Sequence, residues 1–188
     1  SDITSGDDFW EKFSLKLARK YDLPNIKEII VGGDGAGWIK SGADLLGGIY
    51  QLDRFHLLEA LHRSLSHQKA LISPVYQACE KGNLAGVNAL LIQTRNKSRG
   101  DEREGIEQLM RYLRENAGGL KDYRIDLGKE SNGLRRTGAI ESNVDKVAAN
   151  RMKKRGMAWT TEGARRMACI LTLSIEGKLE LAVRQATK

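Results

Sequence analysis

Two acidic residues stand where acids commonly hold a divalent metal ion. Asp34 follows a short apolar run in the turn Gly32-Gly33-Asp34-Gly35, and Glu141 lies far downstream in Ile140-Glu141-Ser142-Asn143. Magnesium prefers hard oxygen ligands and often takes only one or two protein carboxylates, with waters and phosphate oxygens completing its shell. Two such ions about 3.5 to 4 Å apart activate the nucleophile and the leaving oxygen in phosphoryl transfer. Asp34 and Glu141 are therefore our candidate catalytic and metal-binding residues, for Mg²⁺ or Mn²⁺.

The pattern around Asp34 also has simpler interpretations. An aspartate beside glycine often has only a structural role in a turn. Residues 33–37, after a predicted strand, are similar to a dinucleotide fingerprint, but Trp38 replaces the third glycine and a central aspartate would repel a pyrophosphate. A Walker A motif is not met either, because Ile39 and not glycine precedes the Lys-Ser pair.

Asp53 and His56 form a second polar pair, three residues apart, where a predicted strand becomes a helix. The carboxylate could orient the imidazole or cap the helix. We predict a structural hydrogen bond that supports the core, and no metal ligand. His62 and His67 are not expected to bind zinc, because their spacing does not place them on one helix face with other ligands.

The elements that position these residues follow from the hydrophobic pattern. The pattern predicts a helix over 8–21 with Asp8 at its N-cap, and buried strands over 27–31 and 49–52. The first strand would deliver Asp34 at its carboxyl end. The second would deliver Asp53.

The stretch from 55 to 119 has helical periodicity almost throughout. Leucine-rich stripes at helical spacing predict two to four antiparallel helices, with breaks at Pro74 and 96–100 and a helix stop at Gly118-Gly119. A structureless loop of this length would be improbable in a folded domain. We therefore predict an all-helical insertion between the second strand and Glu141.

The last third of the chain carries the strongest positive charge. A helical period places Glu141 in the first turn of a helix, and a further helix is predicted over about 161–173. The formal net charge of +7 favours an anionic partner, above all DNA, although a basic helix end is also typical of a solvated surface. Trp159 is expected in the core, or else stacked on an unpaired base. The predicted DNA-binding residues are Lys146, Arg151, Lys153, Lys154 and Arg155.

The cysteines and the hydropathy indicate the setting. Cys79 and Cys169 stand alone without a C-x-x-C motif, so we expect a reduced cytoplasmic protein without disulfides. No apolar run approaches the roughly 20 residues of a membrane span, and the first residues are too polar for a signal peptide.

Taken in order, the motifs resemble those of the bacterial ISLre-type insertion-sequence transposases, which have been grouped as an uncharacterised protein family and are similar to the Mutator-like DDE transposases. The likeness covers nearly the whole chain and depends on the order and spacing of the motifs. The matching segments are Gly33-Asp34-Gly35-Ala36, Trp38-Ile39-Lys40, Leu52-Asp53-Arg54-Phe55-His56, Gly138-Ala139-Ile140-Glu141-Ser142-Asn143, Arg151-Met152-Lys153, Arg155-Gly156-Met157-Ala158-Trp159 and Gly163-Ala164.

The resemblance implies an RNase H-like catalytic core with an all-helical insertion between the second and third acids. By this likeness Asp34 is the second acid of the DDE triad, Glu141 is the third, and Asp53 and His56 take the place of a supporting C/D-x-x-H motif. The first acid should precede two more strands and a helix, but only one predicted helix precedes the Asp34 strand. The chain thus resembles the C-terminal part of such a transposase, and we expect it to be inactive alone.

We therefore predict a helix-rich α/β fold with a partial RNase H-like core. The predicted segments are 1–54 for the first part of the core, 55–119 for the insertion and 120–188 for the second part. The predicted function is that of a DDE transposase fragment whose parent protein cuts and joins insertion-sequence DNA. The predicted partners of the parent are the transposon ends and the target DNA. A homo-oligomeric parent is compatible with this function. The alternatives are a non-enzymatic basic helical module that binds nucleic acid, and a nucleotide-binding α/β protein.

Overall fold

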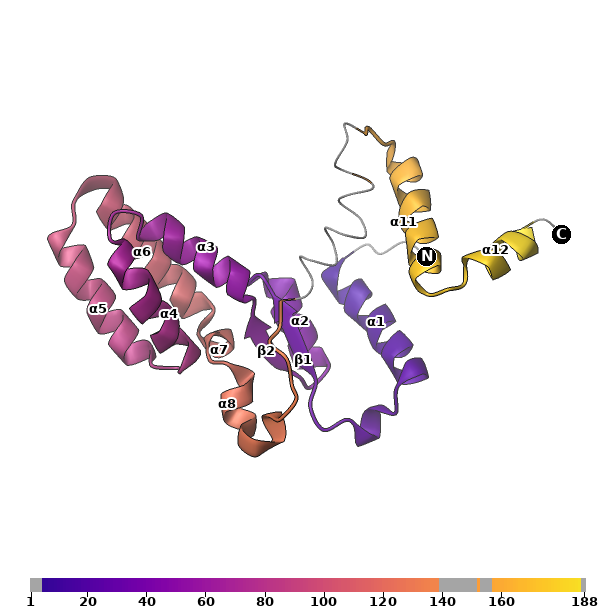
Figure 1. Ribbon diagram of the computed structural model, residues 1–188, viewed down its shortest axis with the longest axis horizontal. Coiled ribbons are helices and arrows are strands. Elements are labelled where there is room, and N and C mark those ends of the chain that lie inside the picture. Colours follow the sequence, from indigo (N-terminus) through magenta and orange to yellow (C-terminus); the bar gives the residue numbers. More distant parts are fainter. Residues whose placement is uncertain (1–4, 139–151, 153–156, 187–188) are drawn as a thin grey trace. The chain divides into compact units, whose positions relative to one another are not determined.

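The computed structural model describes residues 5–138, 152 and 157–186. It divides into two compact units, Ser1–Thr137 and Gly138–Lys188, which we call unit 1 and unit 2 and describe separately (Figure 1). The predicted segments 1–54 and 55–119 both fall in unit 1. The predicted segment 120–188 spans the boundary between the units.

Unit 1 begins with helix α1 (Gly6–Lys20), which a short 3₁₀ turn, η1 (Leu23–Asn25), follows. The prediction that Asp8 caps this helix is wrong by one turn. Ser5 is the N-cap, and its hydroxyl accepts the N–H of Asp8 at 3.1 Å. Asp8 instead lies in the first turn, where its carboxylate is 2.8 Å from the Lys12 ammonium.

A β–α–β unit follows and sets the geometry of the candidate site. Strands β1 (Ile30–Gly33) and β2 (Ile49–Leu52) pair in parallel, with Gly33 opposite Leu52. Helix α2 (Gly37–Leu45) connects them. The second strand confirms the prediction, whereas the first begins three residues later than expected. Because the strands are parallel, Asp34 and Asp53 follow their carboxyl ends at the same edge of the sheet.

A small hydrophobic cluster joins α1 and α2 to β1. Its buried members are Trp10, Val31 and Ala43. The Trp10 indole lies directly on Gly42, where any Cβ would overlap the ring, and its Nε1 donates to the Trp38 carbonyl at 2.7 Å. Gly42 therefore permits the close approach of the two helices.

The stretch after β2 is helical, as predicted, and contains the larger core. Pro74 lies in the first turn of α4, where its missing N–H is not needed, so the predicted break there is wrong. The break at 96–100 separates α5 from α6 and confirms the prediction, whereas Gly118 and Gly119 lie inside the short α7 and do not end a helix. The elements are α3 (Arg54–Ser64), η2 (Lys69–Leu71), α4 (Ile72–Glu80), α5 (Leu84–Lys97), α6 (Gly100–Glu115) and α7 (Ala117–Leu120).

Unit 1 ends with α8 (Tyr123–Leu127), the turn η3 (Gly128–Ser131) and an extended segment to Thr137. Asp122 is the N-cap of α8 and accepts the N–H of Arg124 at 3.0 Å. Its backbone N–H donates to the Glu80 carbonyl at 3.0 Å, which ties α8 to the end of α4.

Unit 2 contains α11 (Thr161–Ile175) and α12 (Leu179–Ala186). The first of these confirms the helix predicted over about 161–173. Trp159 was expected in the core, but it is 37% exposed, with its indole N–H donating to the Met152 carbonyl at 2.9 Å. The indole thus keeps its polar N–H paired although the ring is exposed.

The observed fold is a helix-rich chain with one two-stranded parallel sheet in the part that the structure describes. Cys79 is buried in the larger core, where burial raises the pKa of its thiol to about 11, and Cys169 is exposed; both are free. Within the described ranges no helix is both long and apolar enough to span a bilayer.

Candidate active site at the carboxyl edge of the sheet

Asp34 lies in an exposed turn directly after β1. Its Oδ1 accepts the N–H of Ala36 at 2.9 Å, so the structural role expected of an aspartate in a turn is present. This bond orients the carboxylate and occupies one oxygen. It also places a negative charge at the start of α2, which disfavours the phosphate cradle that a nucleotide-binding protein would need there.

The end of the insertion packs against this turn. Gly35 has φ of +106°, and a Cβ at this position would lie 2.8 Å from Oδ1 of Asn116. Asn116 is 3% exposed, and its Nδ2 donates to the Tyr112 carbonyl at 2.9 Å. Its Oδ1 is buried without a hydrogen-bond partner in the described part of the chain. An oxygen acceptor therefore faces the turn that carries Asp34.

Two tyrosines lie beneath the same turn. The Tyr50 hydroxyl donates to the Gly33 carbonyl at 3.3 Å. Burial, and then the negative charges of Asp34 and other neighbours, raise the pKa of Tyr112 to about 12. Burial also raises the pKa of Tyr50, with contributions from Tyr112 and Asp34. Both phenols are thus neutral at physiological pH and can donate hydrogen bonds.

Asp53 is buried at the end of β2, 5% exposed. Its N–H donates to the Gly33 carbonyl at 2.7 Å, and its carboxylate caps α3 by accepting the N–H of Phe55 at 2.7 Å. Asp53 is therefore held next to the start of the Asp34 turn. Its charge contributes to the raised pKa of both Tyr50 and Tyr112, which puts the two aspartates within electrostatic range of the same rings.

His56 lies in the first turn of α3, with its side chain 29% exposed. Its Nδ1 is 3.7 Å from Oε2 of Glu59, a pairing that carries charge only when the imidazole is protonated. The supporting role of Asp53 and His56 stays a prediction, to which the structure adds that Asp53 caps the helix leaving the sheet.

Lys40 supplies a cation beside the same edge. Its Nζ donates to the Glu115 carbonyl at 2.8 Å and lies 5.7 Å from the centre of the Tyr50 ring. Sequence reasoning missed Lys40, Tyr50, Tyr112 and Asn116 as neighbours of Asp34. Tyr50 lies on β2 and Lys40 on the helix between the strands, so their placement follows from the β–α–β unit. No local signal could have found Tyr112 and Asn116, because their proximity depends on how α6 returns to the sheet.

Glu141 and the predicted DNA-binding residues lie outside the described residues. These residues are Lys146, Arg151, Lys153, Lys154 and Arg155. Among the residues that the structure does describe, no three His, Cys, Asp or Glu side chains form a group that could hold a metal. Asp34 is the candidate metal ligand whose position is established.

The chain is similar to proteins of one family along almost all of its length. The model of "Uncharacterised protein family (UPF0236)" matches residues 2–188. A UPF0236 protein of Caldanaerobacter subterraneus subsp. tengcongensis, whose name joins eleven loci, is 26% identical over 175 residues, covering 91% of this chain and 36% of the relative.

A second relative comes from another organism. The UPF0236 protein in the vanSb 3' region of Streptococcus gallolyticus is 26% identical over 188 residues, covering 95% of this chain and 40% of the relative. The chain thus spans between a third and two fifths of the relatives it matches. No solved structure matches it.

Proposed function

This chain belongs to the uncharacterised protein family UPF0236, and we propose that it forms part of the catalytic domain of a DDE-type transposase. In this proposal the whole protein cuts and joins insertion-sequence DNA with Mg²⁺ or Mn²⁺. Asp34 and Glu141 supply two of the three acids. The partial sheet and the helices around it belong to an RNase H-like core with an all-helical insertion.

The observation that carries the proposal is the placement of Asp34. An exposed carboxylate follows a partly buried parallel strand. Tyr50 donates to the Gly33 carbonyl before this turn, and Asn116 packs against Gly35 within it. Ligands of open α/β sheets bind at the carboxyl ends of parallel strands. A rigid support of this kind holds a catalytic group in a fixed geometry, as metal-assisted chemistry requires.

The names of the relatives add independent support. The name of one relative joins eleven loci of a single organism, and that of another joins four. Many loci sharing one protein in one genome are what an element that copies itself would leave. A non-enzymatic DNA-binding module gives no such reason for repetition.

The donor set fits the metal proposed. The carboxylate of Asp34 is exposed at this edge, and oxygen donors of this kind suit Mg²⁺ and Mn²⁺. A bound divalent ion would supply electrostatic activation of the attacking and leaving oxygens. Asp34 would help to hold it. Asp53 would keep α3 in place at the neighbouring strand, and the basic residues near Glu141 would hold DNA phosphates.

The first test uses a full-length relative that carries the complete set of acids. Asp34→Asn and Glu141→Gln, at the corresponding positions, should abolish metal-dependent cleavage and strand transfer on the element's own ends, while DNA binding stays close to that of the unchanged protein. Asp44→Asn is the matched control, because Asp44 is exposed at the far end of α2. Turnover in either of the first two variants would contradict the assignment.

The 188-residue chain alone provides a second test. Because the resemblance places the first acid elsewhere, this chain should bind DNA without cleaving it in Mg²⁺ or Mn²⁺. Replacing Lys153, Lys154 and Arg155 by Ala should flatten the dependence of DNA affinity on salt, by about 0.9 in log slope for each phosphate that is no longer neutralised. An unchanged slope would assign DNA binding to other residues.

A further inference from the structure

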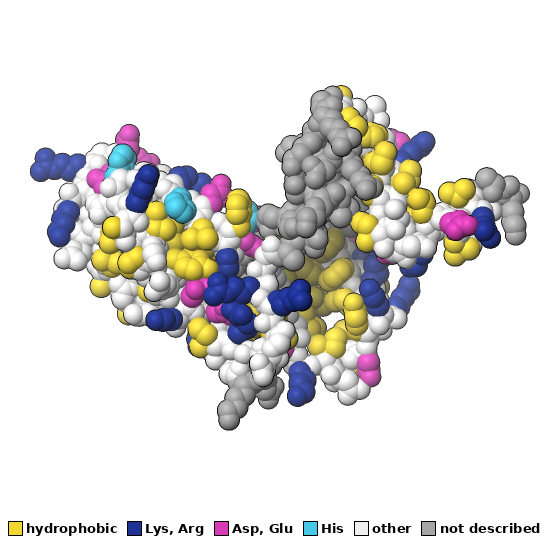
Figure 2. Space-filling model, in the orientation of Figure 1, with side chains coloured by type: hydrophobic (Ala, Val, Ile, Leu, Met, Phe, Trp, Pro, Cys, Tyr) yellow, Lys and Arg dark blue, Asp and Glu magenta, His cyan; other side chains and the backbone are white. Residues whose placement is uncertain are grey.

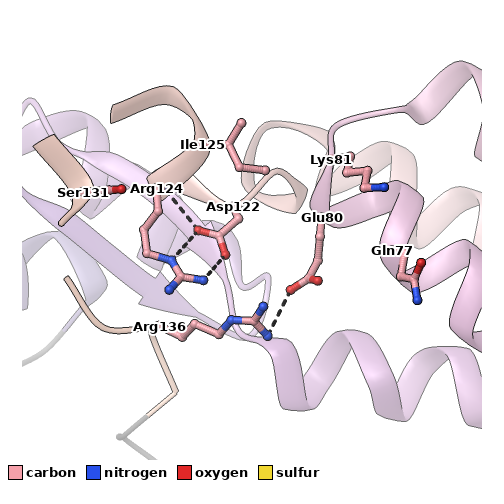
Figure 3. Close-up of a pocket in the computed structure, with 8 residues that line it drawn as sticks. All are labelled: Gln77, Glu80, Lys81, Asp122, Arg124, Ile125, Ser131 and Arg136. Carbon is pink, nitrogen blue, oxygen red and sulfur yellow. Dashed lines mark hydrogen bonds and ion pairs between the residues drawn. The ribbon is translucent and has the colours of Figure 1, made fainter. Parts of the chain in front are cut away.

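A polar cavity of about 410 Å³ opens in unit 1, away from the Asp34 turn (Figure 3). Its walls come from the end of α4, from α8 and from the segment after η3. The cavity is lined by Gln77, Glu80, Lys81, Asp122, Arg124, Ile125, Ser131 and Arg136. Neither the sequence motifs nor the proposed metal site account for this concentration of charge.

A buried arginine joins the two carboxylates of the cavity from behind. The Arg54 side chain is 11% exposed, and its Nη1 donates to the Leu120 carbonyl at 2.8 Å. Its Nε is 3.6 Å from Oε1 of Glu80, and its Nη2 is 3.8 Å from Oδ2 of Asp122. Nη2 has no hydrogen-bond partner in the part of the chain that the structure describes. Arg54 is thus held by ionic contacts and is left with unused donor capacity.

The other two arginines of the cavity each pair with one of the same carboxylates. The Arg124 guanidinium donates two hydrogen bonds to the Asp122 carboxylate, at 3.0 and 2.7 Å. These bonds lower the pKa of Asp122 below its ordinary value. Arg136 is 3.4 Å from Glu80, which already pairs with Arg54 and accepts the Tyr76 hydroxyl at 2.9 Å. Figure 3 shows the Arg136 guanidinium reaching across toward Glu80 from the opposite wall.

The cavity therefore carries an excess of positive charge. Among the described side chains, the cavity is lined by three cations, Arg124, Arg136 and Lys81, and by two carboxylates, Glu80 and Asp122. Arg54 adds a fourth positive charge behind these two carboxylates. Lys81 is exposed and has no ion-pair partner among the described residues. The Arg136 side chain is 55% exposed, so an anion can contact it without breaking the buried pairs. Figure 2 shows Lys and Arg side chains gathered on this view of unit 1, with acidic side chains beside them.

We propose that this cavity binds a backbone phosphate of DNA. The guanidinium fork of Arg136 and the ammonium of Lys81 are the donors that phosphate oxygens prefer. Gln77 adds a neutral donor, because its amide keeps one N–H beyond the bond to Ser73. A diester carries one negative charge, which the excess of two positive charges accommodates. The cavity is larger than one phosphate and leaves room for the attached sugars. The choice of DNA rests on the proposed function, whereas the anion site rests on the cavity alone.

The test measures binding of the 188-residue chain to fluorescein-labelled duplex DNA by anisotropy at several salt concentrations. Arg136→Ala and Lys81→Ala should each weaken binding several-fold at low salt and reduce the log–log salt slope by about 0.9. Arg103→Ala is the matched control, because its side chain is 53% exposed and pairs with Glu107 at 3.2 Å, yet it lies on α6 outside the cavity. Equal slopes for Arg136→Ala and Arg103→Ala would overturn the proposal.

Removing a negative charge from the cavity should have the opposite effect on DNA affinity to removing a positive one. Glu80→Gln removes a negative charge and keeps the acceptor for Tyr76, so DNA should bind more tightly than to the unchanged chain, with thermal melting confirming the fold. Weaker binding by a variant that melts normally would contradict the site.

Two further measurements separate the possible causes of failure. The first is the binding of inorganic phosphate to the unchanged chain and to Arg136→Ala. If the unchanged chain binds phosphate at submillimolar concentration and Arg136→Ala does not, while both bind DNA equally well, the cavity is a small-anion site and the DNA assignment is overturned. Cleavage that survives Asp34→Asn in a relative would reject the proposed function, while a reduced salt slope in Arg136→Ala would still support the cavity.

Discussion

At the scale of single residues, the conformation of the Asp34 turn depends on Gly35. The left-handed φ of +106° is costly for any residue with a Cβ, and that Cβ would press on Asn116 Oδ1. Gly35→Ala should therefore lower the free energy of unfolding by about 1 to 3 kcal/mol in urea titrations. In Gly37→Ala the new Cβ meets nothing within 4 Å in the first turn of α2, so this control should be neutral or stabilising by up to about 1 kcal/mol. Equal losses in both variants would refute this role of Gly35.

Asp122 gives a pH dependence whose sign follows from its lowered pKa. Hydrogen bonds from Arg124 favour the charged carboxylate in the folded chain, so its stabilisation is complete above the ordinary pKa of 3.8 and disappears as pH falls through the lower folded value. Asp122→Asn keeps a capping side chain but removes the charge. It should lower the melting temperature at pH 7, and between pH 4 and pH 2 its melting temperature should fall less than that of the unchanged chain. Parallel melting curves across this range would contradict the account.

Asp34 and Asp53 could be singled out from the sequence because each follows an apolar run at a position where the chain must turn. The residues that surround Asp34 from distant parts of the chain could not be identified in this way. Asn116 and Tyr112 stand more than seventy residues from Asp34, on or just after a helix whose own pattern indicates only which face is buried. Their role depends on packing between segments that are distant in sequence, and periodicity carries no information about it.

At the scale of elements, Gln51 joins β2 to α7, at the end of the insertion, and to α8. It is 2% exposed, its Nε2 donates to the Gly119 carbonyl at 2.6 Å, and its Oε1 accepts the N–H of Tyr123 at 2.9 Å. Gln51→Leu would leave both backbone groups buried and unpaired. We expect it to cost about 1 to 3 kcal/mol for each group in chemical denaturation. Gln108→Leu, at an exposed position on α6, should change stability by no more than about 0.5 kcal/mol. A small effect at Gln51 would show that water or a rearranged backbone replaces these bonds.

The hydrophobic pattern was sufficient for elements that bury one clear face. It predicted β2, α3, α5, α6 and α11, because their apolar residues recur at the period of the element, but it placed a break at Pro74, inside α4. It missed α2, a short helix that contains two glycines, Gly37 and Gly42. Gly42 is required by contact with Trp10, so a tertiary constraint overrides helix propensity there.

At the scale of the whole molecule, the described parts of the two units differ in how many side chains they bury. Both hydrophobic clusters belong to unit 1, whereas Leu171 is the one buried side chain among the described residues of unit 2. A chain ending at Thr137 should therefore melt cooperatively, close to the melting temperature of the full chain, when followed by circular dichroism. The isolated segment 138–188 should show no cooperative transition, because a single buried side chain in its described part cannot offset the chain entropy. Loss of structure in the 1–137 chain would show that unit 1 depends on unit 2.

The hydrogen bond between the Arg54 guanidinium and the Leu120 carbonyl brings the two ends of the all-helical insertion together. A loop whose ends already touch can be lengthened, shortened or exchanged with little effect on the segments that it joins. The insertion can thus diverge in size and surface among relatives while the β1–β2 pair stays unchanged. The requirement that any replacement must meet is local: it has to cover Leu52, which is fully buried, and offer a carbonyl to Gln51.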